Sequence, residues 1–116
     1  MTKTLSDVLM EIYMRKHGTT TTGNHFALSV VEAVWQKGAA TPGVDPTLRR
    51  KDAGGAWIDR NRYGETSNTG WEIDHVFPVA HGGTDNLDNL QPLQWENNRS
   101  KGDSPYFVNY PITARA

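Results

Sequence analysis

The segment after Gly70 constrains the fold more than any other part of the chain. Trp71–His75 alternates in the manner of a β-strand and ends in an Asp-His pair. Pro78 prevents a simple extension of that strand, because proline has no backbone N–H to donate. Gly82 and Gly83 then lie in a long loop, and loops of that length in small domains are usually functional or disordered.

A second strand and a helix complete this pattern. Asn89–Leu93 predicts a short strand, and Gln94–Lys101 predicts a helix that stops at Gly102. Because helices are also expected earlier in the chain, the order of elements indicates an α+β fold.

The N-terminal residues predict a first helix. Its apolar stripe is formed by Leu5, Val8, Leu9, Ile12 and Tyr13. Thr4 is a suitable N-cap, and Gly18 is a suitable end. A second helix is expected from Asn24, as its N-cap, to about Lys37, with Gly38 as its stop.

Residues 39–48 are rich in proline and glycine and predict a loop or linker. Two short helices bury little surface alone. We therefore expect a helical extension with its linker at residues 1–48 and the main domain at residues 49–116. Within the main domain, Ala56–Asp59 predicts a further strand.

The composition narrows the class of protein. The chain has 116 residues, which suits one compact domain, and no cysteine, which excludes disulfides and thiolate zinc sites. No apolar run approaches the length of a membrane span, and residues 1–7 lack the pattern of a secretory signal. We therefore expect a cytoplasmic protein that does not contact membranes, or one that is exported without a cleaved signal.

The charge distribution gives mixed evidence on nucleic-acid binding. The net charge is −1, whereas nucleic-acid-binding proteins are usually basic. Between residues 49 and 62, however, there are five basic residues and only two acidic ones, so this segment carries a local charge of +3. Arg60 and Arg62 are two positions apart, so we expect them to share one strand face, where they either contact phosphate or form an ordinary solvated surface.

Three polar side chains are expected to meet where the first strand ends and the last helix begins. Asp74 and Asn98 offer oxygen ligands that suit Mg²⁺ or Mn²⁺. His75 has an imidazole, whose ordinary pKa near about 6.5 suits proton removal at neutral pH. Hydrolysis of a phosphodiester bond needs both a divalent ion and a base.

The same stretch resembles the HNH endonucleases, also called ββα-metal nucleases. Asp74-His75, Asn89 and the run Asn98–Gly102 match the family pattern in order and approximate spacing. The resemblance covers roughly Arg50–Asp103 and implies a ββα-metal core. It also implies double-stranded DNA as the substrate, although family members act on other nucleic acids as well.

The resemblance implies a role for each matched residue. His75 would be the general base, while Asp74 and Asn98 would hold one divalent ion, with Asn97 as an alternative to Asn98. Asn89 would hold the loop by hydrogen bonds to the backbone. The phosphates would be contacted by Arg99 or Lys101.

One departure from the family pattern affects how the fold is supported. Many members bind a structural zinc through two Cys-x-x-Cys pairs, which this chain lacks. Trp57, Trp71 and Trp95 are therefore expected to support the fold by packing.

Two other functions stay open at this point. A nucleic-acid-binding module with the same fold would need no base, so the intact Asp74, His75 and Asn98 set argues against it. A nuclease of a phage packaging or mobile-element machine would depend on a protein partner. The small size and near-zero net charge favour that reading over a free-standing toxin. A double-strand break would need a homodimer or two encounters.

Overall fold

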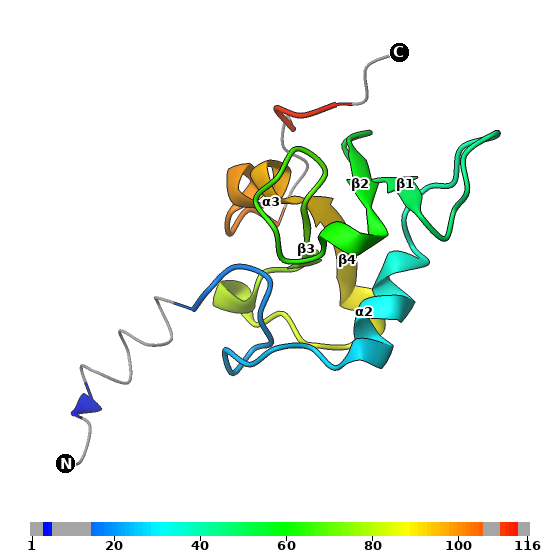
Figure 1. The fold of residues 1–116 in the computed structure, drawn as a ribbon. Helices are drawn as coiled ribbons and strands as arrows, with labels where there is room; N and C mark the ends of the chain where they lie inside the picture. The colour runs from blue at the N-terminus through cyan, green and yellow to red at the C-terminus, as the bar shows by residue number, and fades with distance from the viewer. Residues whose placement is uncertain (1–3, 6–14, 106–109, 114–116) are drawn as a thin grey trace.

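A computed structural model describes residues 4–5, 15–105 and 110–113 (Figure 1). Its helices and strands are α2 (Leu28–Trp35), β1 (Arg49–Lys51), β2 (Trp57–Asp59), β3 (Trp71–His75), β4 (Leu90–Gln94) and α3 (Trp95–Lys101). Three short 3₁₀ helices are η1 (Arg60–Arg62), η2 (Val79–His81) and η3 (Leu87–Asn89). The architecture is α+β, as the sequence predicts. Most of the first predicted helix lies outside the described residues.

The strands form two antiparallel pairs. β1 pairs with β2, so that Arg49 lies opposite Asp59. β3 pairs with β4, so that Trp71 lies opposite Gln94 and His75 opposite Leu90. The predicted strand Trp71–His75 is confirmed with the same bounds, whereas β1 was not predicted.

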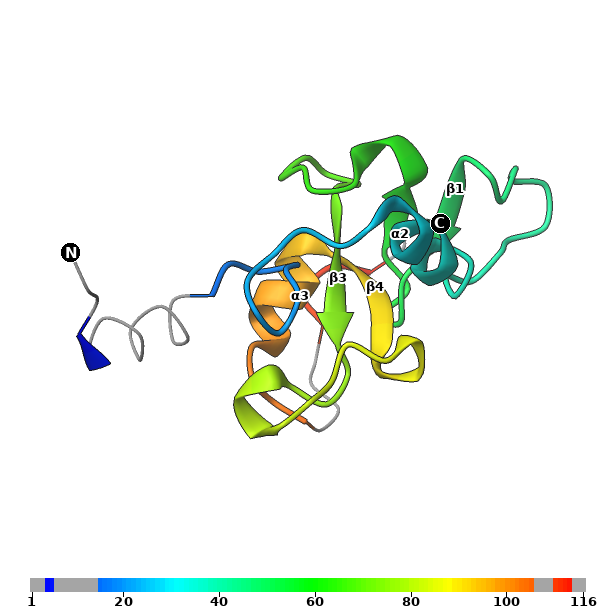
Figure 2. The same cartoon turned by 90° about the horizontal axis from the view of Figure 1, so that it is seen from below.

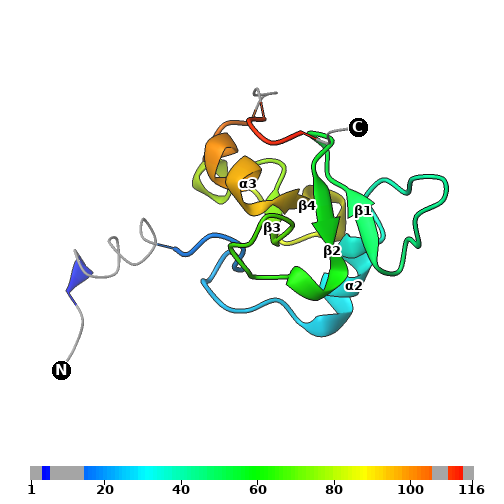
Figure 3. The ribbon, with the colours of Figure 1, turned by 45° about the horizontal axis from the view of Figure 1, so that its top comes forward.

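The β3–β4 hairpin lies between α3 on one side and α2 on the other (Figures 2 and 3). Trp71 and Ile73 join the hydrophobic core that α2 lines with Val34 and Trp35. The rings of Trp35 and Trp71 pack with their centroids 5.3 Å apart. This packing fixes β3 in the centre of the fold.

All five residues of β3 are buried, although the alternating sequence predicts one buried and one exposed face. The second face is buried because α3 covers the side of the strand that carries Glu72 and Asp74. Both side chains are polar, yet each has hydrogen-bond partners on α3, which offset the cost of burial.

A buried carboxylate joins the β1–β2 hairpin to the start of α3. The Oδ1 atom of Asp52 accepts hydrogen bonds from the backbone N–H groups of Gly54 and Ala56, at 2.9 and 2.8 Å. Its Oδ2 atom accepts from the backbone N–H of Gln94 and the side-chain amide of Asn97, both at 2.9 Å. Asp52 therefore holds together elements that are far apart in the sequence.

The helix α3 begins and ends close to the predicted residues. Gln94 is its N-cap, and the side-chain oxygen of Gln94 accepts hydrogen bonds from the backbone of Glu96 and Asn97 at 2.7 and 3.1 Å. Gly102 ends the helix at a positive φ of 53°, a conformation that glycine adopts without strain. The preceding strand runs one residue later than predicted, from Leu90 to Gln94.

The predicted start of the second helix is wrong. The N-cap of α2 is Ala27, which makes no side-chain capping bond. Asn24 instead closes a turn, because its backbone carbonyl accepts from Thr20 N–H at 2.8 Å and its own N–H donates to the Thr20 hydroxyl at 3.1 Å. Asn24 therefore belongs to a turn before the helix, and its side-chain amide donates to the Thr22 hydroxyl at 3.1 Å.

The predicted strand face shared by Arg60 and Arg62 is also wrong. Both residues lie in the 3₁₀ helix η1, which follows β2 directly. Arg60 forms an ion pair with Glu32 of α2, and Arg62 forms one with Glu65 at 3.1 Å. The two guanidinium groups are therefore held by different neighbours.

The tryptophans support the fold in two ways. Trp35 and Trp71 are buried in the core. Trp57 and Trp95 are only partly buried and carry cations over their rings, with Lys51 4.7 Å from the ring centre of Trp57. Cation–π contact thus accompanies packing at these two positions.

The structure contains no helix, within residues 4–5, 15–105 and 110–113, that is long and apolar enough to cross a membrane.

Replacing Asp52 should destabilise the whole domain. In Asp52→Ala, three buried donors and the partly buried N–H of Gly54 lose their acceptor. Unpaired buried donors cost roughly 1–3 kcal/mol each before relaxation. We expect the free energy of unfolding to fall by about 3 kcal/mol or more, as measured by urea denaturation. Asp88→Ala, at an exposed carboxylate, is the control and should change it little. Equal stability of the two variants would contradict this view of Asp52.

Candidate active site

Side chains from β3, α3 and the N-terminal residues line one cavity of about 660 Å³. Asp74 and His75 come from β3, and Asn98 comes from α3. Arg15 and His17 line it from the N-terminal side. The three residues that the sequence predicts as the chemical centre therefore share one cavity wall.

Asp74 is buried and has two partners. Its Oδ1 atom lies 3.2 Å from the ammonium of Lys101, and its Oδ2 atom accepts a hydrogen bond from Gln91 at 2.9 Å. Burial raises the pKa of Asp74 above its ordinary value, and the hydrogen bond from Gln91 and the charge of Lys101 oppose that rise. The carboxylate is thus held by its neighbours in a water-poor position.

Lys101 does not present its ammonium to the surface. Its side chain is 4% exposed. The Nζ atom contacts Asp74 and also donates to the backbone carbonyl of His75 at 3.0 Å. In this structure Lys101 therefore acts as the counter-charge of Asp74.

Glu72 orients the side chain of Asn98. The Nδ2 atom of Asn98 donates to Glu72 Oε1 at 3.1 Å, which fixes the direction of the amide, because a carboxylate only accepts. The Oδ1 atom of Asn98 accepts no hydrogen bond from the described residues. The oxygen of Asn98 is therefore not engaged by the described residues.

Asn97 is occupied on the other side of α3. Its amide donates to Asp52 and to the backbone carbonyl of Ile112, and its oxygen accepts from Ile112 N–H. Asn97 does not line the cavity. Of the two neighbouring asparagines, the one placed at the cavity is therefore Asn98.

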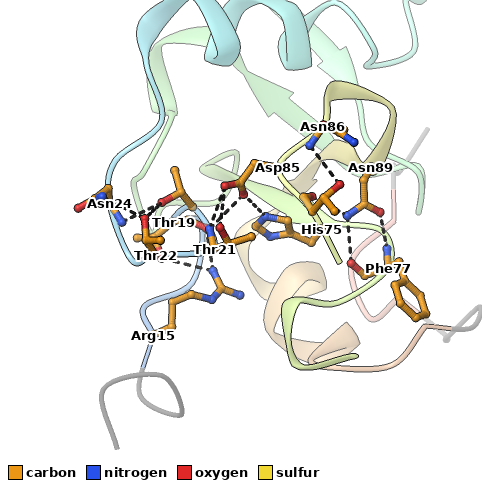
Figure 4. A network of polar contacts seen from close by, with 12 residues as sticks. Arg15, Thr19, Thr21, Thr22, Asn24, His75, Phe77, Asp85, Asn86 and Asn89 are labelled. Atoms are coloured by element: carbon orange, nitrogen blue, oxygen red, sulfur yellow. Dashed lines mark hydrogen bonds and ion pairs between the residues drawn. The ribbon is translucent and has the colours of Figure 1, made fainter. Parts of the chain in front are cut away.

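His75 is 4% exposed at the end of β3 and contacts two residues from other segments. Its Nε2 atom lies 2.8 Å from Asp85 Oδ1 (Figure 4). The centroid of its ring lies 6.0 Å from that of Phe26. These contacts define the orientation of the imidazole.

Asn89 makes three hydrogen bonds to the backbone of the loop after β3. Its oxygen accepts from Phe77 N–H at 2.8 Å, and its amide donates to the carbonyls of Phe77 and Thr84 at 3.1 and 2.8 Å (Figure 4). Gly83 completes the loop, because a Cβ atom there would come within 1.8 Å of the carbonyl oxygen of Phe77. The loop therefore has a defined shape.

Arg99, the other residue expected to contact phosphate, is exposed, whereas Lys101 is buried. Arg99 is 43% exposed, and its guanidinium lies 4.9 Å from the ring centre of Trp95 and 3.6 Å from Glu72. Its charge is thus accessible near the cavity-lining residue Asn98, whereas Arg60 and Arg62 lie in η1 with their own ion-pair partners.

The side-chain oxygens of Asp74 and Asn98 are of the kind that hard divalent ions bind. No group of three or more His, Cys, Asp or Glu side chains in the described residues could hold a metal. Mg²⁺, however, usually keeps several waters and needs only one or two protein carboxylates. Asp74 and the unoccupied Asn98 oxygen suit such a site, while the Lys101 ammonium on the same carboxylate weakens the attraction for a cation.

Sequence reasoning missed three residues that hold the predicted centre. Glu72 is two positions before Asp74 on β3, so strand spacing alone places both on one face. Gln91 lies directly opposite Asp74 in the register. Asp85 had no such signal, because its contact with His75 depends on the path of the loop.

Comparison with known proteins gives one match. Residues 61–104 match the family described as HNH endonuclease, which confirms the resemblance over that stretch. The matched residues include β3, β4 and α3 and thus most of the cavity wall described above. No curated protein and no solved structure matches the chain.

Removing only Lys101 from its buried ion pair with Asp74 should lower the free energy of unfolding more than removing both charges. Lys101→Met leaves Asp74 buried without its counter-charge, so we expect the free energy of unfolding at pH 7 to fall by about 3 kcal/mol or more. Asp74→Asn with Lys101→Met should be less destabilised, because no lone charge stays buried. Urea denaturation measures both.

The same variant should respond to pH with a defined sign. The pKa of Asp74 is already raised, so lowering the pH protonates its carboxyl readily and removes the unpaired charge in Lys101→Met. The stability difference from the wild type should therefore narrow as the pH falls. A stability difference that stays constant as the pH falls would argue against a charged Asp74 in the variant.

Proposed function

We propose that this chain, whose residues 61–104 match the HNH endonuclease family, is an endonuclease that hydrolyses phosphodiester bonds in DNA with one divalent ion. The observation that carries the proposal is the cavity that Asp74, His75 and Asn98 line together. In this proposal the β3–β4 hairpin and α3 form the ββα-metal core, and residues 1–48 remain an extension of the domain at residues 49–116.

His75 is the proposed general base. Its ring lines the cavity and is held by Asp85, so that one ring nitrogen can take a proton from water. The water oxygen attacks phosphorus, the bond to the 3′ oxygen breaks, and the strand is cut. Burial of the ring keeps its orientation from one turnover to the next.

Asp74 and Asn98 are the proposed protein ligands of Mg²⁺ or Mn²⁺. When bound, the ion supplies positive charge that stabilises the transition state and the leaving oxygen. Glu72 keeps the Asn98 oxygen directed away from its own carboxylate, and Gln91 steadies Asp74. Asn89 supports the loop next to His75 through its backbone bonds.

Four basic residues are the proposed phosphate contacts, and none of them is among the described residues that line the cavity. Arg99 is the best placed, because its guanidinium is partly exposed. Arg60 and Arg62 could bind phosphate through donors that their ion pairs do not use. Lys101 would first have to leave Asp74, so we assign it a supporting role.

Cleavage of plasmid DNA tests the proposal directly. Purified protein should nick supercoiled plasmid with Mg²⁺ or Mn²⁺ and not with EDTA, and His75→Ala should lower the rate by about 10²-fold or more. His81→Ala is the matched control, because this histidine lines the same cavity without an assigned role. Full activity of His75→Ala would refute the base, and an inactive folded wild type would refute a self-sufficient nuclease.

Ion binding tests the proposed ligands independently of cleavage. Asp74→Asn keeps the shape of the side chain and removes its charge, so calorimetry should show that Mn²⁺ affinity falls by about tenfold or more. Asn89→Ala, which changes the loop and no proposed ligand, should bind the ion much as the wild type does. Unchanged affinity in Asp74→Asn would remove Asp74 from the ion site.

A further inference from the structure

Asp85 connects the proposed base to the N-terminal part of the chain. Its Oδ1 atom lies 2.8 Å from His75 Nε2 and 3.0 Å from the backbone nitrogen of Thr21. Its Oδ2 atom accepts from the Thr21 hydroxyl at 2.9 Å (Figure 4). Asp85 is 64 positions from Thr21 and 10 from His75, so one carboxylate joins distant segments of the sequence.

The chemistry of the pair decides which ring nitrogen carries the proton. An ionised carboxylate only accepts hydrogen bonds, so Nε2 of His75 must be the donor. Burial acts to raise the pKa of Asp85, but hydrogen bonds from His75 and Thr21 outweigh it and leave the pKa below its ordinary value. The neutral ring then carries its lone pair on Nδ1, which has no hydrogen bond from the described residues.

The N-terminal segment holds this carboxylate in place. Thr21 contributes both its backbone N–H and its hydroxyl to Asp85. The turn that carries Thr21 is itself closed, because Thr20 N–H donates to the Asn24 carbonyl at 2.8 Å and Arg15 donates to the Thr19 carbonyl at 2.7 Å. Asp85 is thus held by Thr21 as well as by His75.

We propose that Asp85 is a positioning residue that fixes His75 as the Nε2–H tautomer, which leaves Nδ1 as the atom that accepts the proton, and that Thr21 holds Asp85 for this task. This inference rests on the proposed role of His75 as the base. It makes residues 15–24 part of the active site and gives Asp85 a function that acts through His75.

The tautomer itself can be observed without any cleavage assay. Long-range ¹H–¹⁵N NMR of the metal-free protein, at a pH where the ring is neutral, should show His75 protonated at Nε2. In Asp85→Leu the ring loses its acceptor, so a mixture of tautomers or the Nδ1–H form is expected. Asp85→Asn should keep the wild-type tautomer, because its amide oxygen can accept from Nε2 while its NH₂ group faces the Thr21 hydroxyl.

Kinetics with the same variants separate positioning from binding. Asp85→Leu should lower kcat by roughly 10- to 100-fold with little change in KM, the size of effect typical of residues that orient a functional histidine. Asp85→Asn should keep most of that activity. Asp88→Leu, the same substitution at an exposed neighbouring carboxylate, should behave as the wild type.

The outcomes distinguish this inference from the proposed function. An Asp85→Leu protein that retains the Nε2–H tautomer and the wild-type kcat overturns the role of Asp85. An inactive wild type overturns the nuclease proposal, while the NMR comparison still tests whether Asp85 sets the tautomer. Asp85→Ala repeats both measurements without an added apolar group, so that poor folding of the leucine variant does not decide the result.

Discussion

The four hydrogen bonds accepted by the buried Asp52 carboxylate hold the two halves of the fold together. One oxygen closes the hairpin of β1 and β2, and the other binds the backbone of Gln94 and the amide of Asn97. Because Gln94 also caps α3, the direction of that helix depends on the same group. The position of Asn98 at the cavity follows from it.

One face of β3 packs in the hydrophobic core, and the other carries polar side chains that contact α3. Trp71 and Ile73 belong to the hydrophobic core beside α2, whereas Glu72 and Asp74 meet polar side chains of α3. Each polar group on that face is paired, so the strand can be buried on both sides. The same arrangement places the proposed base, His75, where the strand leaves the core.

The sequence predicts the elements around the cavity well and the contacts between distant segments poorly. The bounds of β3 and the end of α3 at Gly102 follow from local periodicity and glycine chemistry, which are properties of short segments. The start of α2 differs because Asn24 makes a local turn with Thr20. The path of the loop to Asp85 depends on tertiary contacts, so local rules could not supply it. For the same reason, the sequence does not show that Lys101, expected as a phosphate contact, is buried beside Asp74.

The cavity is assembled from both ends of the described chain, since Arg15 and His17 line it together with Asn98 and Gly102. Contacts of such long sequence separation form late and slow the folding of a small domain, because a large loop must close before they stabilise anything. A chain that is still being synthesised therefore contains residues 71–75 before it contains the residues of β4 and α3 that pack against them. The complete constellation arises only in the finished fold, so partly made chains carry the separate residues without the site.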